Sequence, residues 1–210
     1  MRKRITECVL LLLIGGTLTV SAVEPISFEG GFTRAVMREG RETILLTQGA
    51  VVESGSVRFE AETIELVGPA SRYVIGTNNV QISDKQNGLI ITSNTISFDR
   101  ETEQLLTDGW VEIQDLEHEV IASGAYFSYS RTDGLLQLQI AAKLLRHTDK
   151  GAMVCRADSI EYDRNGMFLS LLGGASIEWK GDSYQASVIT VDLNTNEIVM
   201  KGTIKGNVNG

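Results

Sequence analysis

The chain has 210 residues, a formal net charge of −8 at pH 7, two cysteines and two histidines. Its acidic balance argues against nucleic-acid binding, which depends on basic side chains that release counterions from phosphates, and against binding to an anionic membrane face. Neither histidine has a cysteine or a second histidine at metal-ligand spacing, so we expect no metal site and no cofactor.

The N-terminal segment has the features of a secretory signal peptide. Three basic residues at positions 2–4 precede the apolar run from Cys8 to Val20, and small residues precede a cleavage site after Ala22. The run is shorter than the roughly 20 residues of a transmembrane helix. We therefore predict cleavage of residues 1–22, which removes three basic residues and one acidic residue and leaves a charge of about −10. A retained short anchor is the alternative.

The rest of the sequence repeats itself about five times. Its anchor positions lie 32, 31, 33 and 29 residues apart by subtraction, at Ile64, Ile96, Phe127, Ile160 and Ile189. Apolar and polar residues alternate within each copy, which is typical of a strand with one buried face. A period of this size indicates a stacked or wound architecture. Because no helical periodicity is sustained after the first 30 residues, the predicted fold class is all-β.

Each copy contains one phase slip at the same place. The spacing of inward residues changes there from two to three, as from Ala61 to Ile64. An extra residue would turn every later side chain to the wrong face unless the strand bends or bulges. The last inward residue before the slip is always small: Ala61, Ser93, Gly124, Ala157 and Ala186. We therefore predict a tight corner at this position.

Polar turns with Asp-Gly or Asn-Gly signals separate the strands, as at 130–134 and 163–166. Strand, turn, strand and break predict an antiparallel meander, with a lead-in segment over residues 23–43 and a single domain over 44–210. The segment from Ala141 to Lys150 departs from the pattern, because Ala141-Ala142 replaces the usual glycine.

The sequence offers no catalytic constellation. It lacks a Gly-x-Ser-x-Gly elbow and a phosphate-binding glycine loop. Carboxylates are plentiful, but most fall at outward strand positions or in turns, where solvation explains them. Cys155 lies on the inward phase and is expected to be a small core residue. We expect no enzyme activity, although a facing carboxylate pair of the glycosidase kind stays open.

The repeat resembles that of the periplasmic lipopolysaccharide-transport family, called OstA-like or LptA-like. The copies that carry the resemblance best are Asn79–Ile82 with Ser93–Asp99, and Ala157–Asp163. The resemblance runs from about Ile44 to the C-terminus. It implies a tapering, open-ended β-jellyroll in the periplasm, whose two facing sheets shelter acyl chains of lipopolysaccharide or a related glycolipid. It also implies partners in the inner-membrane and outer-membrane transport complexes.

The inward phase supplies the candidate lipid-binding residues. A closed, dry core is the alternative for the same side chains. The set is Phe59, Ile64, Leu66, Leu89, Ile91, Ile96, Phe98, Phe127, Tyr129, Ile160, Tyr162, Tyr184, Ile189 and Val191.

The two ends of the sheet suggest self-association. Ile44–Val52 and Ile198–Gly210 are strand-like and lack a strong cap, which favours head-to-tail strand addition between copies of this chain. Fraying of Lys205–Gly210 in a monomer is the alternative. Two other functions stay open: a membrane-anchored jellyroll partner, and a surface glycan-binding β-solenoid. Trp110 and Trp179 fit either a carrier or a glycan-binding protein.

Overall fold

Thirteen antiparallel strands follow one another in chain order within one sheet, and each is hydrogen-bonded to the next up to β12, while β13 pairs with β11. The computed structural model describes residues 24–38 and 40–209, so the predicted signal peptide lies outside the described residues. Over those two ranges, no helix has the length and apolar character needed to span a membrane. The predicted all-β class and antiparallel meander are confirmed.

The strands alternate with short turns, and a single 3₁₀ turn (Pro69–Ser71) lies between β3 and β4. The strand bounds are β1 Ile26–Val36, β2 Thr43–Ser54, β3 Val57–Val67, β4 Tyr73–Asp84, β5 Leu89–Asp99, β6 Gln104–Asp115, β7 Val120–Ser130, β8 Leu135–Arg146, β9 Met153–Asp163, β10 Phe168–Trp179, β11 Asp182–Asp192, β12 Glu197–Lys201 and β13 Lys205–Asn207.

Each long strand bends near its middle, where the pairing register shifts. Between β2 and β3, for example, the pairing jumps from Thr47 with Thr63 to Ala50 with Ala61. The even-numbered strand thus has two unpaired residues at the bend where the odd-numbered strand has one, which is a β-bulge. The predicted corner is confirmed, and the small residues that precede it lie on its inner side.

The bends of β2, β4, β8 and β10 include left-handed backbone, as in Gln48-Gly49 of β2 and Asn78-Asn79 of β4. Glycine and asparagine tolerate this conformation. In β8 the same place is taken by Ile140 and Ala141, with φ of 58° and 53°. The departure noted in the sequence therefore marks a bend built from residues that adopt this conformation at a steric cost.

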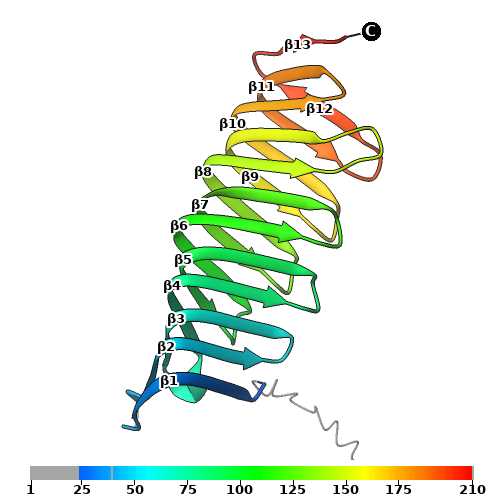
Figure 1. The fold of residues 1–210 in the computed structure, drawn as a ribbon. Helices are drawn as coiled ribbons and strands as arrows, with labels where there is room; N and C mark the ends of the chain where they lie inside the picture. Colours follow the sequence, from blue (N-terminus) through cyan, green and yellow to red (C-terminus); the bar gives the residue numbers. More distant parts are fainter. Residues whose placement is uncertain (1–23, 39, 210) are drawn as a thin grey trace, which may run out of the picture.

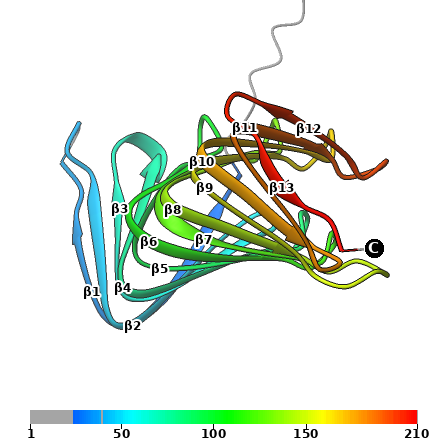
Figure 2. The same ribbon diagram turned by 90° about the horizontal axis from the view of Figure 1, so that it is seen from above.

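The aligned bends fold the sheet into two layers, which diverge from the line of bends (Figures 1 and 2). Opposite the bends, two rows of turns border the long side of the molecule, which we call the mouth. Edge A is the row of turns after the even-numbered strands, together with the last residue of each of these strands: 54–56, 84–88, 115–119, 146–152 and 179–181. Edge B is the row after the odd-numbered strands from β3 onward: 68–72, 100–103, 131–134, 164–167 and 193–196.

The sheet begins earlier than the sequence pattern suggested. Strand β1 lies within the expected lead-in segment and pairs with β2 along its length. The N-terminal edge of the sheet is therefore β1, and Ile44–Val52, which was expected to be the edge, lies in β2 between two neighbours. Nearly every residue of β1 is exposed, so its sequence lacks the alternation that identifies the other strands.

Candidate functional site: the interior between the layers

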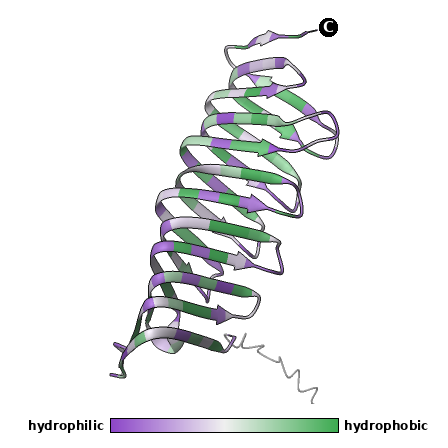
Figure 3. Cartoon of the chain, viewed as in Figure 1, coloured by the Kyte–Doolittle hydropathy of each residue, from purple (hydrophilic) through white to green (hydrophobic). Residues whose placement is uncertain are grey.

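The interior is one continuous apolar core that runs from β2 to β11. All of the candidate lipid-binding residues except Tyr184 are 0–2% exposed, and Tyr184 is partly buried. Figure 3 shows the alternation of hydrophobic and hydrophilic residues along the strands that produces this burial. The inward phase read from the sequence is confirmed, and contact of these side chains with lipid stays a prediction.

The space between the layers widens from the bends to the mouth, and the size of the buried side chains increases in the same direction. Small residues such as Ala61 and Ala157 occupy the inner side of the bend, where the layers meet. The largest fully buried side chains include Tyr129, Tyr162 and Phe59, which lie nearer the mouth, and the rings of Phe59 and Phe98 stack at 5.8 Å. Among residues 24–38 and 40–209, no backbone hydrogen bond joins the two layers across the wedge, so packing of side chains between the layers holds the core together.

The two ends of the core are less well covered than its middle. Phe28 of β1 pairs with the buried Val52 and therefore faces the interior, yet it is 40% exposed. At the other end, Ile198 and Met200 of β12 are partly buried against the core. The apolar column thus reaches the surface at both ends of the sheet.

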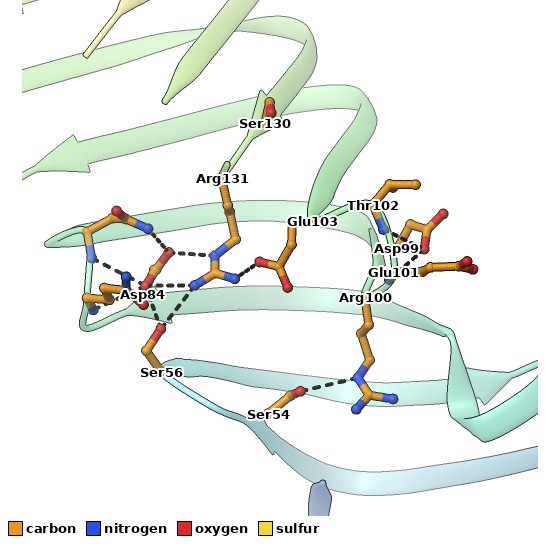
Figure 4. Close-up of polar contacts among 12 residues, drawn as sticks. Ser54, Ser56, Asp84, Asp99, Arg100, Glu101, Thr102, Glu103, Ser130 and Arg131 are labelled. Carbon is orange, nitrogen blue, oxygen red and sulfur yellow. Dashed lines mark hydrogen bonds and ion pairs between the residues drawn. The ribbon is translucent and has the colours of Figure 1, made fainter. Parts of the chain in front are cut away.

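Two buried ion pairs, which we call clasps, cross the mouth from edge B to edge A. Arg131 Nε lies 2.8 Å from Asp84 Oδ2, and Arg164 Nε lies 2.7 Å from Asp115 Oδ2. Figure 4 shows Arg131 extending from its turn toward Asp84 and Ser56 on the opposite row. Both carboxylate side chains are at most 1% exposed. The long side of the core is closed by these contacts.

The Arg131–Asp84 clasp is supported on edge A by further donors. Ser56 Oγ, the side-chain amide of Asn87 and the backbone amide of Gln86 all donate to the Asp84 carboxylate. Burial tends to raise the pKa of Asp84, but the Arg131 guanidinium and these donors outweigh it and hold that pKa below its usual value.

The Arg164–Asp115 clasp is the more deeply buried of the two. Asp115 also accepts hydrogen bonds from the Tyr162 hydroxyl at 3.2 Å, and His118 Nδ1 lies 2.9 Å from its carboxylate. Burial tends to raise the pKa of Asp115, but Arg164 and His118 lower it below its usual value. Burial near this carboxylate also raises the pKa of the Tyr162 hydroxyl, which keeps it protonated as a donor.

The same contact recurs at other levels of the stack with different residues. Arg100 on edge B donates from Nε to Ser54 Oγ at 3.2 Å, and Arg146 at the end of β8 donates to the Leu193 carbonyl at 2.7 Å. These partners are 46 and 47 residues apart, close to the 47 and 49 of the two clasps. At the Leu193 level the arginine comes from the opposite layer.

Sequence reasoning placed the clasp residues in solvated turns and so missed them. The signal was present, because Arg100, Arg131 and Arg164 occupy the first turn position in three successive repeats, 31 and 33 residues apart by subtraction. Their partners lie 46–49 residues away in the opposite row, and only the bend brings the two rows together.

The remaining candidate residues have structural positions. Cys155 is fully buried in the core, as expected, and burial raises the pKa of its thiol to about 12. Trp110 lies on the outer face, 52% exposed, and Trp179 packs partly buried against the core. Among residues 24–38 and 40–209, no group of three His, Cys, Asp or Glu side chains is arranged to hold a metal ion.

The fold and its interior define a repeat-built all-β protein with an apolar core that runs from β2 to β11. Residues 75–197, more than half of the chain, match the sequence profile of the family described as LptA/(LptD N-terminal domain) LPS transport protein. The chain belongs to this family, which confirms the resemblance read from its repeats.

Among solved structures, the chain is similar to LptH, the LptA homologous periplasmic component of the conserved lipopolysaccharide transport device from Pseudomonas aeruginosa. The two are 14% identical, with a TM-score of 0.35, over 73% of this chain and 95% of LptH. No match is found among the curated proteins. The family assignment therefore rests on the sequence profile.

Proposed function

We propose that this chain is a periplasmic lipid carrier. In this role it shelters the acyl chains of lipopolysaccharide or a related glycolipid between its two layers, on the way from the inner to the outer membrane. Its family is described by lipopolysaccharide transport. The observation that carries the proposal is the apolar column from β2 to β11, which is closed at the mouth by contacts of arginine side chains.

The energetics favour a sheltered path. Exposing an acyl chain to water costs about 0.8 kcal/mol per methylene, or on the order of 10 kcal/mol for a chain of a dozen carbons. In the closed core the two layers bury each other's apolar side chains. When an acyl chain lies between them, those side chains exchange contacts with each other for contacts with the lipid, so apolar surface stays out of water on both sides.

The proposal includes the assembly and the processing predicted from the sequence. Residues 1–22 direct export and are removed, and the remaining chain acts as a single domain. Copies join head to tail, because β1 presents an unpaired strand edge at one end and β12 with β13 at the other. Inner-membrane and outer-membrane transport components bind at the two ends of such a chain. Sedimentation velocity over a range of concentrations tests the head-to-tail step.

Lipid capture in the interior is the direct test of the carrier function. A photo-crosslinking amino acid replaces Phe98, which is 2% exposed, and in a matched control it replaces Glu65 on the outer face of β3. A third variant carries it at Tyr184, which is only partly buried and tolerates a larger side chain better. After expression with native lipids, captured lipid is identified by mass spectrometry.

Lipid captured at Phe98 and Tyr184 but not at Glu65 supports the carrier function and identifies the cargo. If folded protein captures lipid at none of the three positions, the carrier function is wrong.

A further inference from the structure

The mouth is the side of the core along which the layers can separate. In the described residues, the backbone hydrogen bonds between turns all run along one edge, such as Arg131 N to the Glu103 carbonyl on edge B and Leu116 N to the Gly88 carbonyl on edge A. None of them crosses from edge A to edge B. Opening the mouth within these ranges therefore breaks side-chain contacts and leaves the strand ladder intact.

Opening would affect the two partners of the deeper clasp unequally. Asp115 would keep His118 Nδ1 at 2.9 Å and the backbone amide of Glu117 at 3.2 Å, because these groups lie on its own edge. Arg164 would lose Asp115 and the Asn87 carbonyl, both on edge A. After the layers separate, the Asp115 carboxylate therefore still has hydrogen-bond donors, whereas the Arg164 guanidinium has lost its anionic partner.

Arg164 has little on its own edge to replace what it loses. Its remaining contact is the Tyr129 hydroxyl at 3.5 Å, which is a neutral group. Arg131 differs, because it also pairs with Glu103 on its own edge and keeps that carboxylate when the layers part. A guanidinium at the rim of an apolar core needs a charged partner. When the mouth is open, Arg164 therefore binds an added anion more readily than Arg131 does.

We propose that Arg164 recognises the phosphate of a phosphorylated acyl lipid, which replaces the Asp115 carboxylate as the acyl chains part the layers at the mouth. Guanidinium groups bind carboxylates and phosphates through the same paired N–H geometry, so one anion substitutes for the other. The clasp then selects a lipid with an anionic phosphate and excludes a neutral lipid with the same chains. This inference rests on the proposed carrier function.

The test compares two lipids that differ only in the phosphate. The mature protein, residues 23–210, is titrated by calorimetry with dioctanoyl phosphatidic acid and with dioctanoylglycerol, each below its aggregation concentration, and with inorganic phosphate alone. We expect the wild type to bind phosphatidic acid at least about tenfold more tightly than the neutral lipid. Inorganic phosphate should not bind comparably, because it brings no acyl chains to open the mouth.

Variants assign the preference to the clasp. Arg164→Gln combined with Asp115→Asn replaces both charges by amides, so that no buried charge is left alone, and circular dichroism confirms folding. We expect its affinity for phosphatidic acid to fall to that for dioctanoylglycerol, and Arg164→Lys to keep part of the preference. Arg156→Gln is the matched control, because Arg156 pairs with Glu178 on the exposed outer face of the neighbouring strands.

Several results would overturn the inference. Equal affinity of the wild type for both lipids would remove the role of the phosphate while leaving the carrier function in place. A folded double variant that keeps the wild-type preference would place recognition elsewhere. Comparable binding of inorganic phosphate would indicate a plain anion site. If the wild type binds neither lipid, the carrier function falls and this inference falls with it.

Discussion

Breaking the Arg164–Asp115 clasp should cost far more stability than breaking an ion pair on the surface. Arg164→Gln leaves the Asp115 carboxylate at 1% exposure without its guanidinium. Removing one partner of a buried pair typically costs about 3–5 kcal/mol, whereas replacing both partners is often close to neutral. We therefore expect a coupling energy of about 3 kcal/mol between the two substitutions.

The exposed pair Arg156–Glu178, on the outer face of β9 and β10, is compared with the buried clasp. Its side chains are 46% and 61% exposed, so solvent screens their attraction and the expected coupling is about 0–1 kcal/mol. Both double-mutant cycles are measured by urea unfolding, followed by circular dichroism and analysed by linear extrapolation. The slope with urea must stay constant across each cycle for the comparison to be valid.

The buried pair should therefore couple more strongly than the exposed pair. Coupling energies within about 0.5 kcal/mol of each other for the two pairs would mean that water reaches the clasp and that it does not close the mouth. A double variant as unstable as Arg164→Gln alone would show that the loss comes from packing of the arginine stem and not from the unpaired carboxylate.

Three further outcomes follow from burial, charge and backbone conformation. Ile140→Asn should raise the free energy of unfolding by about 1 kcal/mol in urea titration, because Asn tolerates the left-handed backbone there, as Asn78 does in β4. A decrease in the free energy of unfolding would mean that the exposed isoleucine packs against a neighbour. Because the folded-state pKa values of Asp84 and Asp115 lie below the unfolded value of about 3.9, their stabilisation is present above that pH and is lost as pH falls through the folded values. Unfolding scans between pH 7 and 2 should show this loss, reduced in the double amide variant. Cys155, with a pKa of about 12, should resist iodoacetamide at pH 8 until the protein unfolds, as followed by peptide mass mapping, and rapid modification of the folded chain would indicate that the core opens.

The parts of the fold that depend on local pattern were predictable. Burial on one face imposes a two-residue period, and a bend imposes a phase slip with a small residue inside it, as at Ala61 before Ile64. Both signals recur in every repeat, so the inward residues and the corners could be read directly. The sequence pattern predicted a break between two short strands, but in β4 the strand continues through the left-handed pair Asn78-Asn79.

The parts that depend on distant contacts were not predictable in the same way. Strand β1 carries no clear alternation because it is the end strand of the sheet and both of its faces are largely exposed. The clasps join Asp84 with Arg131 and Asp115 with Arg164 across two folded layers, and sequence spacing alone does not distinguish a charge aimed into a mouth from one in a solvated turn. A periodic arginine was the only sign, and it gained meaning once the bend had placed the two rows together.

Because backbone hydrogen bonds join successive turns along each edge, the length of the molecule is set by its number of hairpins. Most hairpins bond to the equivalent hairpin of the next repeat by a backbone contact, such as His147 N to the Glu119 carbonyl or Arg164 N to the Gly134 carbonyl. Adding or deleting one hairpin would move the far end by two strand spacings, about 10 Å, without altering the cross-section. The length of such a protein can therefore change only in whole steps of one hairpin.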